Sequence, residues 1–198
     1  MGKLYYIIGK SCAGKDSVFK KLLSESRPPI KPLVIWTTRP MREGERQDRD
    51  YHFTDEEGLA RLEAEGRVIE RRTYDTVRGI WNYFTADTED TDLDRYDYLG
   101  VGVLSSYVAL KKYYGADRVI PVYLEVEDGI RLERAIKRER LQRVPQYAEA
   151  CRRFLADSED FSEDKLKEAG IERRFENIDF ETCFLEVAAF IAASRNMC

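Results

Sequence analysis

The segment Gly9-Lys10-Ser11-Cys12-Ala13-Gly14-Lys15-Asp16 decides the fold of this chain of 198 residues. It follows an apolar run at residues 4–8 and precedes apolar residues at helical spacing from Lys15 onward. A G-x-x-x-x-G-K frame between a strand and a helix is the pattern of a phosphate-binding loop. The glycines let the backbone curl so that its N–H groups face phosphate oxygens, and Lys15 adds a mobile ammonium. We therefore expect residues 9–17 to bind the phosphates of a nucleotide.

Position 16 departs from the usual pattern, in which a Ser or Thr hydroxyl reaches Mg²⁺. Asp16 stands there, and Ser17 follows it. A carboxylate is a hard oxygen ligand that suits Mg²⁺, although it also places negative charge beside the phosphates. Either Asp16 binds the metal directly or through water, or the Ser17 hydroxyl takes that role. We predict the metal site at Asp16.

Strand and helix patterns alternate along the rest of the chain. Short apolar runs predict strands at residues 33–36, 68–72, 96–104, 118–126 and 173–176. Helical spacing predicts helices at residues 59–65, 105–114, 129–142, 146–157 and 180–193. Residues 74–92 indicate irregular or hairpin structure. This alternation implies right-handed βαβ units, so the expected fold class is α/β, with a P-loop NTPase-type parallel sheet flanked by helices.

Two of the predicted helices, at residues 129–142 and 146–157, are rich in arginine. Helical spacing places Arg131, Arg134 and Arg138 on one outward stripe of the first helix. We expect its inward residues to be Leu132, Ala135 and Ile136, and those of the second helix to be Tyr147, Cys151, Phe154 and Leu155.

The composition excludes several classes of protein. Apolar residues make up 43% of the chain, enough for a buried core, and 33 Lys+Arg against 37 Asp+Glu give a net charge of −4. This mild acidity argues against binding along nucleic-acid polymers, and no apolar run is long enough to span a membrane. The scattered cysteines form no metal or disulfide pattern. We expect a reduced, cytoplasmic protein whose acidic run at residues 157–164 balances its cationic segments.

A second group of polar residues suits a small phosphorylated acceptor. It comprises Thr37-Thr38-Arg39-Pro40-Met41-Arg42-Glu43-Gly44-Glu45, followed by Asp50-Tyr51-His52-Phe53. Two arginines three positions apart suit bidentate contact with phosphate, and Tyr51 offers a further hydrogen bond. Glu70 can accept both N1–H and N2–H of guanine, whereas the unprotonated N1 of adenine repels it. A surface ion pair with Arg71 or Arg72 is the alternative role for Glu70.

These residues resemble the guanylate kinase family. The run TTRPMREGE…DYHF is similar to that family's TTR-x-x-R-x-G-E…DYHF signature, and the resemblance continues through both arginine-rich helices to Asn177 and the last helix. It implies substrate contacts at Thr38, Arg39, Arg42, Tyr51, Glu70, Tyr83 and Thr85. It also implies catalytic roles for Lys15, Arg134, Arg138, Arg152 and Arg153, and an adenine-side contact at Asn177.

The resemblance also implies how the chain is organised and what it does. A core would comprise residues 1–36, 93–127 and 159–198, with a nucleoside-monophosphate-binding segment at 37–92 and a helical lid at 128–158. The implied activity is Mg²⁺-dependent phosphoryl transfer from ATP to GMP, giving ADP and GDP. Small nucleotides, rather than nucleic-acid polymers or membranes, are the expected partners.

Some positions depart from the family pattern and leave two other functions open. Ile35 stands where the family usually has Ser, Gly100 lies in the segment where it has Asp, and Phe84 replaces Gly. The chain could therefore be a guanylate-kinase-like binding module with weak catalysis. It could also be a P-loop kinase that acts on another nucleotide or on a phosphorylated sugar.

Overall fold

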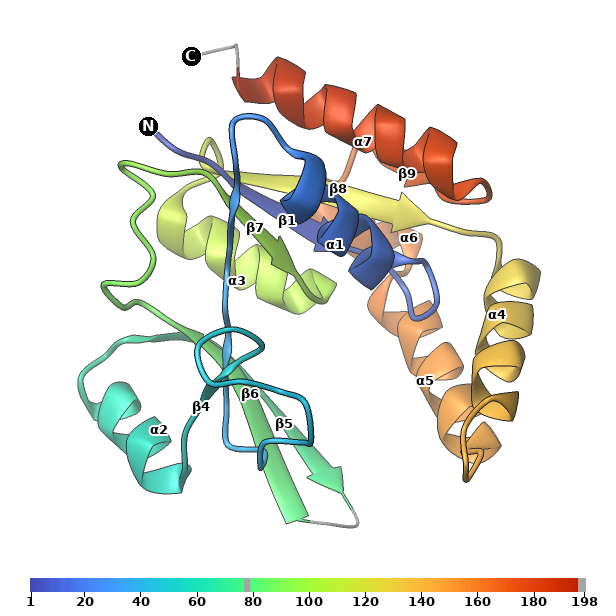
Figure 1. Cartoon of the computed structure of the whole chain (residues 1–198), viewed down its shortest axis with the longest axis horizontal. Helices are drawn as coiled ribbons and strands as arrows, with labels where there is room; N and C mark the ends of the chain where they lie inside the picture. The colour runs from blue at the N-terminus through green and yellow to red at the C-terminus, as the bar shows by residue number, and fades with distance from the viewer. Residues whose placement is uncertain (77–78, 196–198) are drawn as a thin grey trace.

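A five-stranded sheet forms the centre of the computed structural model, which describes residues 1–76 and 79–195 (Figure 1). The strand order is β2-β7-β1-β8-β9, and every neighbouring pair is parallel. The predicted parallel α/β fold class is confirmed. The strands are β1 (Leu4–Ile8), β2 (Lys31–Pro32), β7 (Tyr98–Val101), β8 (Val119–Glu125) and β9 (Arg174–Glu176).

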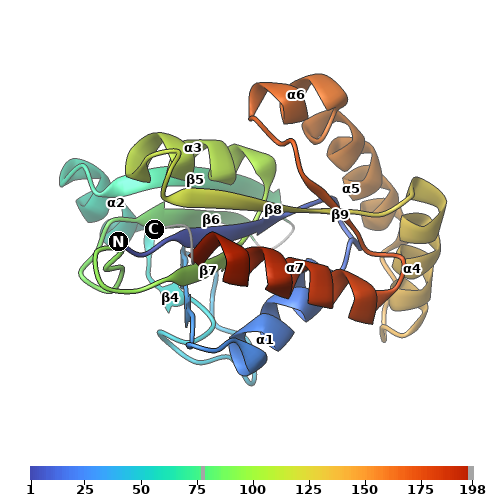
Figure 2. The same cartoon turned by 90° about the horizontal axis from the view of Figure 1, so that it is seen from above.

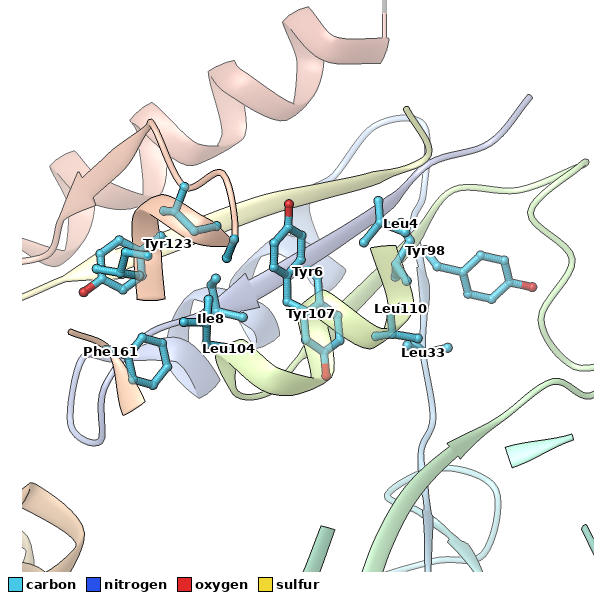
Figure 3. Packing of buried hydrophobic residues seen from close by; sticks show 14 of the residues in the cluster. Leu4, Tyr6, Ile8, Leu33, Tyr98, Leu104, Tyr107, Leu110, Tyr123 and Phe161 are labelled. Carbon is cyan, nitrogen blue, oxygen red and sulfur yellow. The ribbon is translucent and has the colours of Figure 1, made fainter. Parts of the chain in front are cut away.

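Helices cover both faces of this sheet (Figure 2). Because side chains alternate along a strand, Tyr5 and Ile7 of β1 pack on one face, while Leu4, Tyr6 and Ile8 pack on the other (Figure 3). All five side chains are fully buried, so β1 is the centre of the core. The first face is covered by α1 (Lys15–Glu25) and α7 (Phe180–Arg195), the second by α3 (Leu104–Tyr114) and α6 (Glu163–Glu168).

A second, smaller sheet lies beside the core, with the strand order β4-β3-β6-β5 (Figure 1). Its two longest strands pair antiparallel, so within the segment predicted as irregular or hairpin the described residues 74–76 and 79–86 are strand and 87–92 are irregular; residues 77–78 lie outside the described residues. The strand predicted at residues 33–36 is wrong for residues 33–35, which form no strand and connect β2 of the first sheet to β3 of the second. The elements of this part are β3 (Trp36–Thr37), β4 (His52–Phe53), α2 (Glu56–Ala64), β5 (Val68–Thr76) and β6 (Gly79–Ala86).

The arginine-rich helices α4 (Asp128–Arg140) and α5 (Tyr147–Asp160) project from the core as a pair (Figure 1). Their predicted inward faces are partly wrong. Ile136 is exposed whereas Arg131 is buried, because Arg131 forms ion pairs with two aspartates. In α5 no residue is buried, since the helix packs mainly against α4 and the phosphate loop; the predicted buried residues Tyr147, Cys151 and Leu155 are exposed.

Crossing a bilayer takes a helix of about 20 mostly apolar residues. Among the residues that the structure describes, no helix combines the length and the apolar character needed to cross a bilayer.

Candidate functional site

The loop between β1 and α1 has the backbone conformation of a phosphate cradle. Cys12 and Gly14 both have positive φ angles, 64° and 89°, which curl the chain. A Cβ atom at Gly14 would lie 2.3 Å from Nδ2 of Asn177, so only glycine fits. That same Nδ2 donates a hydrogen bond of 2.8 Å to the Ala13 carbonyl, and Asn177 is buried. Asn177 therefore holds the loop in its curled conformation through the Ala13 carbonyl.

Lys15 folds back over this loop. Its Nζ donates to the carbonyl oxygens of Gly9 and Lys10, at 2.6 and 3.1 Å. Burial lowers the pKa of Lys15, an effect that the charges of Asp16 and Asp157 oppose. The ammonium thus lies in a partly desolvated position, where an incoming phosphate would interact with it strongly.

A carboxylate from helix α5 already occupies one anion position of the loop. The backbone N–H of Ser11 donates to Oδ2 of Asp157 at 2.7 Å, and Nη2 of Arg131 donates to the same oxygen at 3.0 Å. The Nε of Arg131 also donates to the Ser11 carbonyl at 3.0 Å. Sequence reasoning assigned Asp157 only to a compensating acidic run. Asp157 follows Arg153 by four residues, about one helical turn, so the sequence could have indicated that the two side chains share one face of α5.

The predicted lid arginines lie at different distances from the loop. Arg134 reaches it, because its Nη2 donates to the Asn177 carbonyl at 2.8 Å and its Nη1 lies 3.4 Å from the Cys12 carbonyl. The charge of Arg153 acts on Lys15 and contributes to lowering its pKa. The remaining two arginines form ion pairs within their own helices, Arg138 with Glu139 and Arg152 with Glu149.

The other predicted loop residues lie at its rim. Lys10 forms an ion pair of 3.4 Å with Asp128 at the start of α4. Asp16 and Ser17 are exposed on the first turn of α1. A carboxylate in that position fits a Mg²⁺ ion shared with bound phosphates, whereas no group of three metal-ligating side chains exists within residues 1–76 and 79–195.

The predicted phosphate-acceptor residues gather on β3, β6 and the loop between β3 and β4. Arg39 is buried and holds Glu45 in a bidentate ion pair, at 2.9 and 3.0 Å. Its Nε donates to the hydroxyl of Tyr83 at 3.1 Å, and its guanidinium lies over the Tyr51 ring. Arg42 is exposed, so it is the arginine available to a ligand. Arg39 therefore holds Glu45 and Tyr83 in place, and exposed Arg42 offers a guanidinium that none of these contacts occupies.

Glu70 lies at the other end of the hairpin face in a dense polar cluster. Its carboxylate accepts hydrogen bonds from Thr85, Ser106 and Arg72. Sequence reasoning predicted Glu70 and Thr85 and named Arg72 as a possible ion-pair partner of Glu70, but it missed Ser106; the Arg72–Glu70 pair is largely buried rather than on the surface. Thr38 directly follows β3, and its hydroxyl accepts from the backbone N–H of Asn82 in β6, which ties the end of β3 to β6.

Gly100, one of the departures from the family pattern, has a steric explanation. A Cβ atom at this position would lie 2.5 Å from a ring carbon of Tyr6. Tyr6 itself is fully buried on β1 against α3 (Figure 3). The tyrosine ring therefore fills the space that a side chain at position 100 would need.

A parallel sheet with this loop and lysine defines an α/β protein of the P-loop class. Comparison with known proteins narrows the class: residues 1–80 match the family model described as guanylate kinase. The guanylate kinase of Thermotoga maritima is 27% identical over 201 residues, covering 99% of this chain and 81% of that protein. These two sequence matches relate the chain to guanylate kinases.

Other relatives match more strongly over shorter segments. The guanylate kinase of Legionella pneumophila (strain Lens) is 45% identical over 69 residues, which cover 35% of this chain and 32% of that protein. The chain thus spans about a third of the length of such relatives in these alignments. A solved guanylate kinase structure from Anaplasma phagocytophilum shares the fold, with a TM-score of 0.62, 21% identity, and coverage of 97% of this chain and 85% of that one.

Proposed function

We propose that this chain is a cytoplasmic guanylate kinase that transfers a phosphoryl group from ATP to GMP, giving ADP and GDP. The observation that carries the proposal is the presence of two candidate phosphate sites in one chain: the Lys15 loop, and the Arg39–Glu45–Tyr83 group with exposed Arg42. Phosphoryl transfer needs alignment and charge neutralisation more than covalent help from the protein. A donor site and an acceptor site, each with its own cations, would supply both once closure brings them together.

On the donor side, the loop N–H groups and Lys15 would hold the phosphates of ATP. Mg²⁺, when bound, would neutralise phosphate charge, and Asp16 is the residue proposed to hold it. Asn177 would keep the loop in its curled conformation through the Ala13 carbonyl. The lid arginines Arg134, Arg138, Arg152 and Arg153 would supply positive charge to the transferring group as the helices close and exclude water.

On the acceptor side, Tyr83 has a directed role. Because its hydroxyl oxygen accepts from Arg39, the hydroxyl proton remains available for a phosphate oxygen of GMP. Arg42 and Tyr51 would complete the phosphate site, while Thr38 and Thr85 fix the strands that carry it. The core (1–36, 93–127 and 159–198), the acceptor segment (37–92) and the lid (128–158) would then move as three bodies during closure.

A coupled assay of ADP formation tests this proposal, with ATP and each of GMP, dGMP, AMP, CMP and UMP in turn. We expect turnover that is selective for GMP. Turnover only with another acceptor would instead support a kinase of different specificity. Nucleotide binding without any turnover would indicate a binding module.

The pH dependence of the reaction should reveal the desolvated Lys15. Its lowered pKa means that the ammonium loses its proton at a lower pH than an ordinary lysine. Activity that needs the ammonium is complete below this pKa and falls above it. We expect the basic limb of kcat/KM for ATP, which reports the free enzyme, to lie below that of kcat, because bound phosphate favours the charged form. Coincident basic limbs would contradict this role of Lys15.

Substitution of Asp157 should strengthen ATP binding. Its carboxylate holds the Ser11 N–H, so a phosphate oxygen must displace it. Asp157→Asn keeps the shape but weakens this charge-assisted bond by roughly 1 kcal/mol, and we expect the KM for ATP to fall about fivefold. The control is Asp160→Asn, an exposed residue of the same helix. A KM that stays constant or rises would mean that Asp157 remains in place when ATP binds.

A further inference from the structure

The hairpin that carries the candidate acceptor site also carries an arginine that the proposed function leaves unused. Side chains on one face of a strand alternate, so Glu70 and Arg72 of β5 share a face. In the antiparallel register, Glu70 lies opposite Thr85 and Arg72 lies opposite Tyr83. Arg72 thus lies between the residue proposed to read the base and the residue proposed to bind the phosphate.

Glu70 has little remaining capacity to accept hydrogen bonds. Oε1 accepts from Thr85 Oγ1 at 2.9 Å and from Arg72 Nη2 at 3.5 Å. Oε2 accepts from Ser106 Oγ at 3.0 Å and from Arg72 Nε at 3.1 Å. A carboxylate offers about four lone-pair positions, and all of them are engaged. Glu70 alone therefore does not present two vacant acceptors to a pair of base N–H groups.

Arg72, by contrast, has N–H donors beyond the two that it directs to Glu70. Only 18% of its side chain and 7% of that of Glu70 are exposed, so the pair is largely desolvated. Burial acts to lower the pKa of Arg72, but the charge and hydrogen bond of Glu70, together with Tyr6 and Tyr74, raise that pKa overall. Within the described part of the chain, Arg72 donates only to Glu70, through Nε and Nη2. No other described residue accepts from its remaining N–H groups, so they can donate to a ligand.

We propose that Arg72 and Glu70 read the acceptor base as one unit, in which Arg72 donates to a keto oxygen and Glu70 accepts from the adjacent ring N–H. This inference rests on the proposed function and extends its acceptor site. The weak bond of 3.5 Å from Nη2 is the one exchanged for the base. Glu70 thus orients Arg72 as well as contacting the base, and Thr85 and Ser106 hold the carboxylate in place.

The pair defines a chemical class of acceptor. Guanine and hypoxanthine present O6 beside N1–H, so donor meets acceptor at both positions. Adenine and cytosine present the reverse pattern, an amino group beside an unprotonated nitrogen, which sets donor against donor. Reading by Glu70 alone would require the 2-amino group of guanine, whereas the pair does not. The inference therefore predicts that IMP is an acceptor within about tenfold of GMP.

The test compares Arg72→Gln with Arg71→Gln in the full-length protein. Arg71 is a matched control, because it is the neighbouring residue on the opposite face and pairs with Glu63 at 2.7 Å. With ATP as donor, we expect Arg72→Gln to lower kcat/KM for GMP and IMP by on the order of 10–100-fold, while the low value for AMP is unchanged or rises. Arg71→Gln should leave all three within about twofold of the wild type.

Two outcomes would overturn the inference. One is an equal loss with GMP, IMP and AMP in Arg72→Gln, which indicates a structural role only. The other is activity with GMP and IMP that stays within about twofold of the wild type in Arg72→Gln. If Arg72→Gln does not fold, as judged by its thermal unfolding, Arg72→Lys provides the same comparison. Lysine keeps the charge but lacks the planar set of donors, so the ratio of GMP to AMP activity should still fall.

Calorimetric binding of GMP, IMP and AMP to the wild type and to Arg72→Gln separates this inference from the proposed function. Binding selective for GMP and IMP that depends on Arg72, without turnover, supports base reading while contradicting the kinase. Turnover of GMP that does not depend on Arg72 supports the kinase and overturns the inference. Absence of binding by all three nucleotides overturns both.

Discussion

Lys15→Met is expected to lower kcat/KM for ATP by at least ~10²-fold. The ammonium lies over the loop, within hydrogen-bond distance of two loop carbonyls, in a position where phosphate would replace them as its partner. Methionine has a similar length but carries no charge, so the loop keeps its shape and loses the cation that stabilises developing phosphate charge.

Steady-state kinetics with ATP as the varied substrate measure the effect of Lys15→Met. Lys20→Met provides the control, because Lys20 is exposed on the same helix. Its kinetics should match the wild type. Near-normal turnover in Lys15→Met would remove the loop from the mechanism.

Arg42→Ala is the second substitution with a large expected effect, a loss of at least ~10²-fold in kcat/KM for GMP. The guanidinium of Arg39 is already committed to Glu45 and Tyr83, so Arg42 is the exposed cation of the acceptor group. Removing Arg42 leaves the acceptor phosphate with Tyr51 and Tyr83 as hydrogen-bond donors. The KM for ATP should stay within about twofold of the wild-type value, because the donor loop is separate.

Varying GMP at saturating ATP measures this loss. Arg46→Ala, in the same loop and also exposed, is the matched control and should retain activity. Equal losses in both variants would mean that general positive charge, rather than a specific contact by Arg42, accounts for the effect.

Much of the fold was predictable because its signals are local. The phosphate loop is one contiguous motif, and β1 and α1 flank it as the apolar pattern requires. The bounds of α4 and α5 were predicted within a few residues, but their inward faces were partly wrong. Arg131 is buried because it pairs with Asp157, 26 residues further along the chain, and helical periodicity carries no information about such a partner.

The cluster around Glu70 illustrates an intermediate case. In the sequence, Glu70, Arg71 and Arg72 are consistent with a surface ion pair. The predicted strand at residues 68–72 already contained the distinguishing signal, because alternation places Arg72 beside Glu70 and Arg71 on the opposite face. The hydroxyl of Ser106 was not predictable, since it reaches Glu70 from helix α3, 36 residues away.

The most direct test of phosphoryl transfer to GMP uses ATP labelled at its γ-phosphate. The full-length protein is incubated with labelled ATP, GMP and Mg²⁺, and the nucleotides are then separated. We predict that the label appears in GDP and that Lys15→Met abolishes this transfer. Label that remains in ATP, or that appears only as inorganic phosphate, would contradict the account.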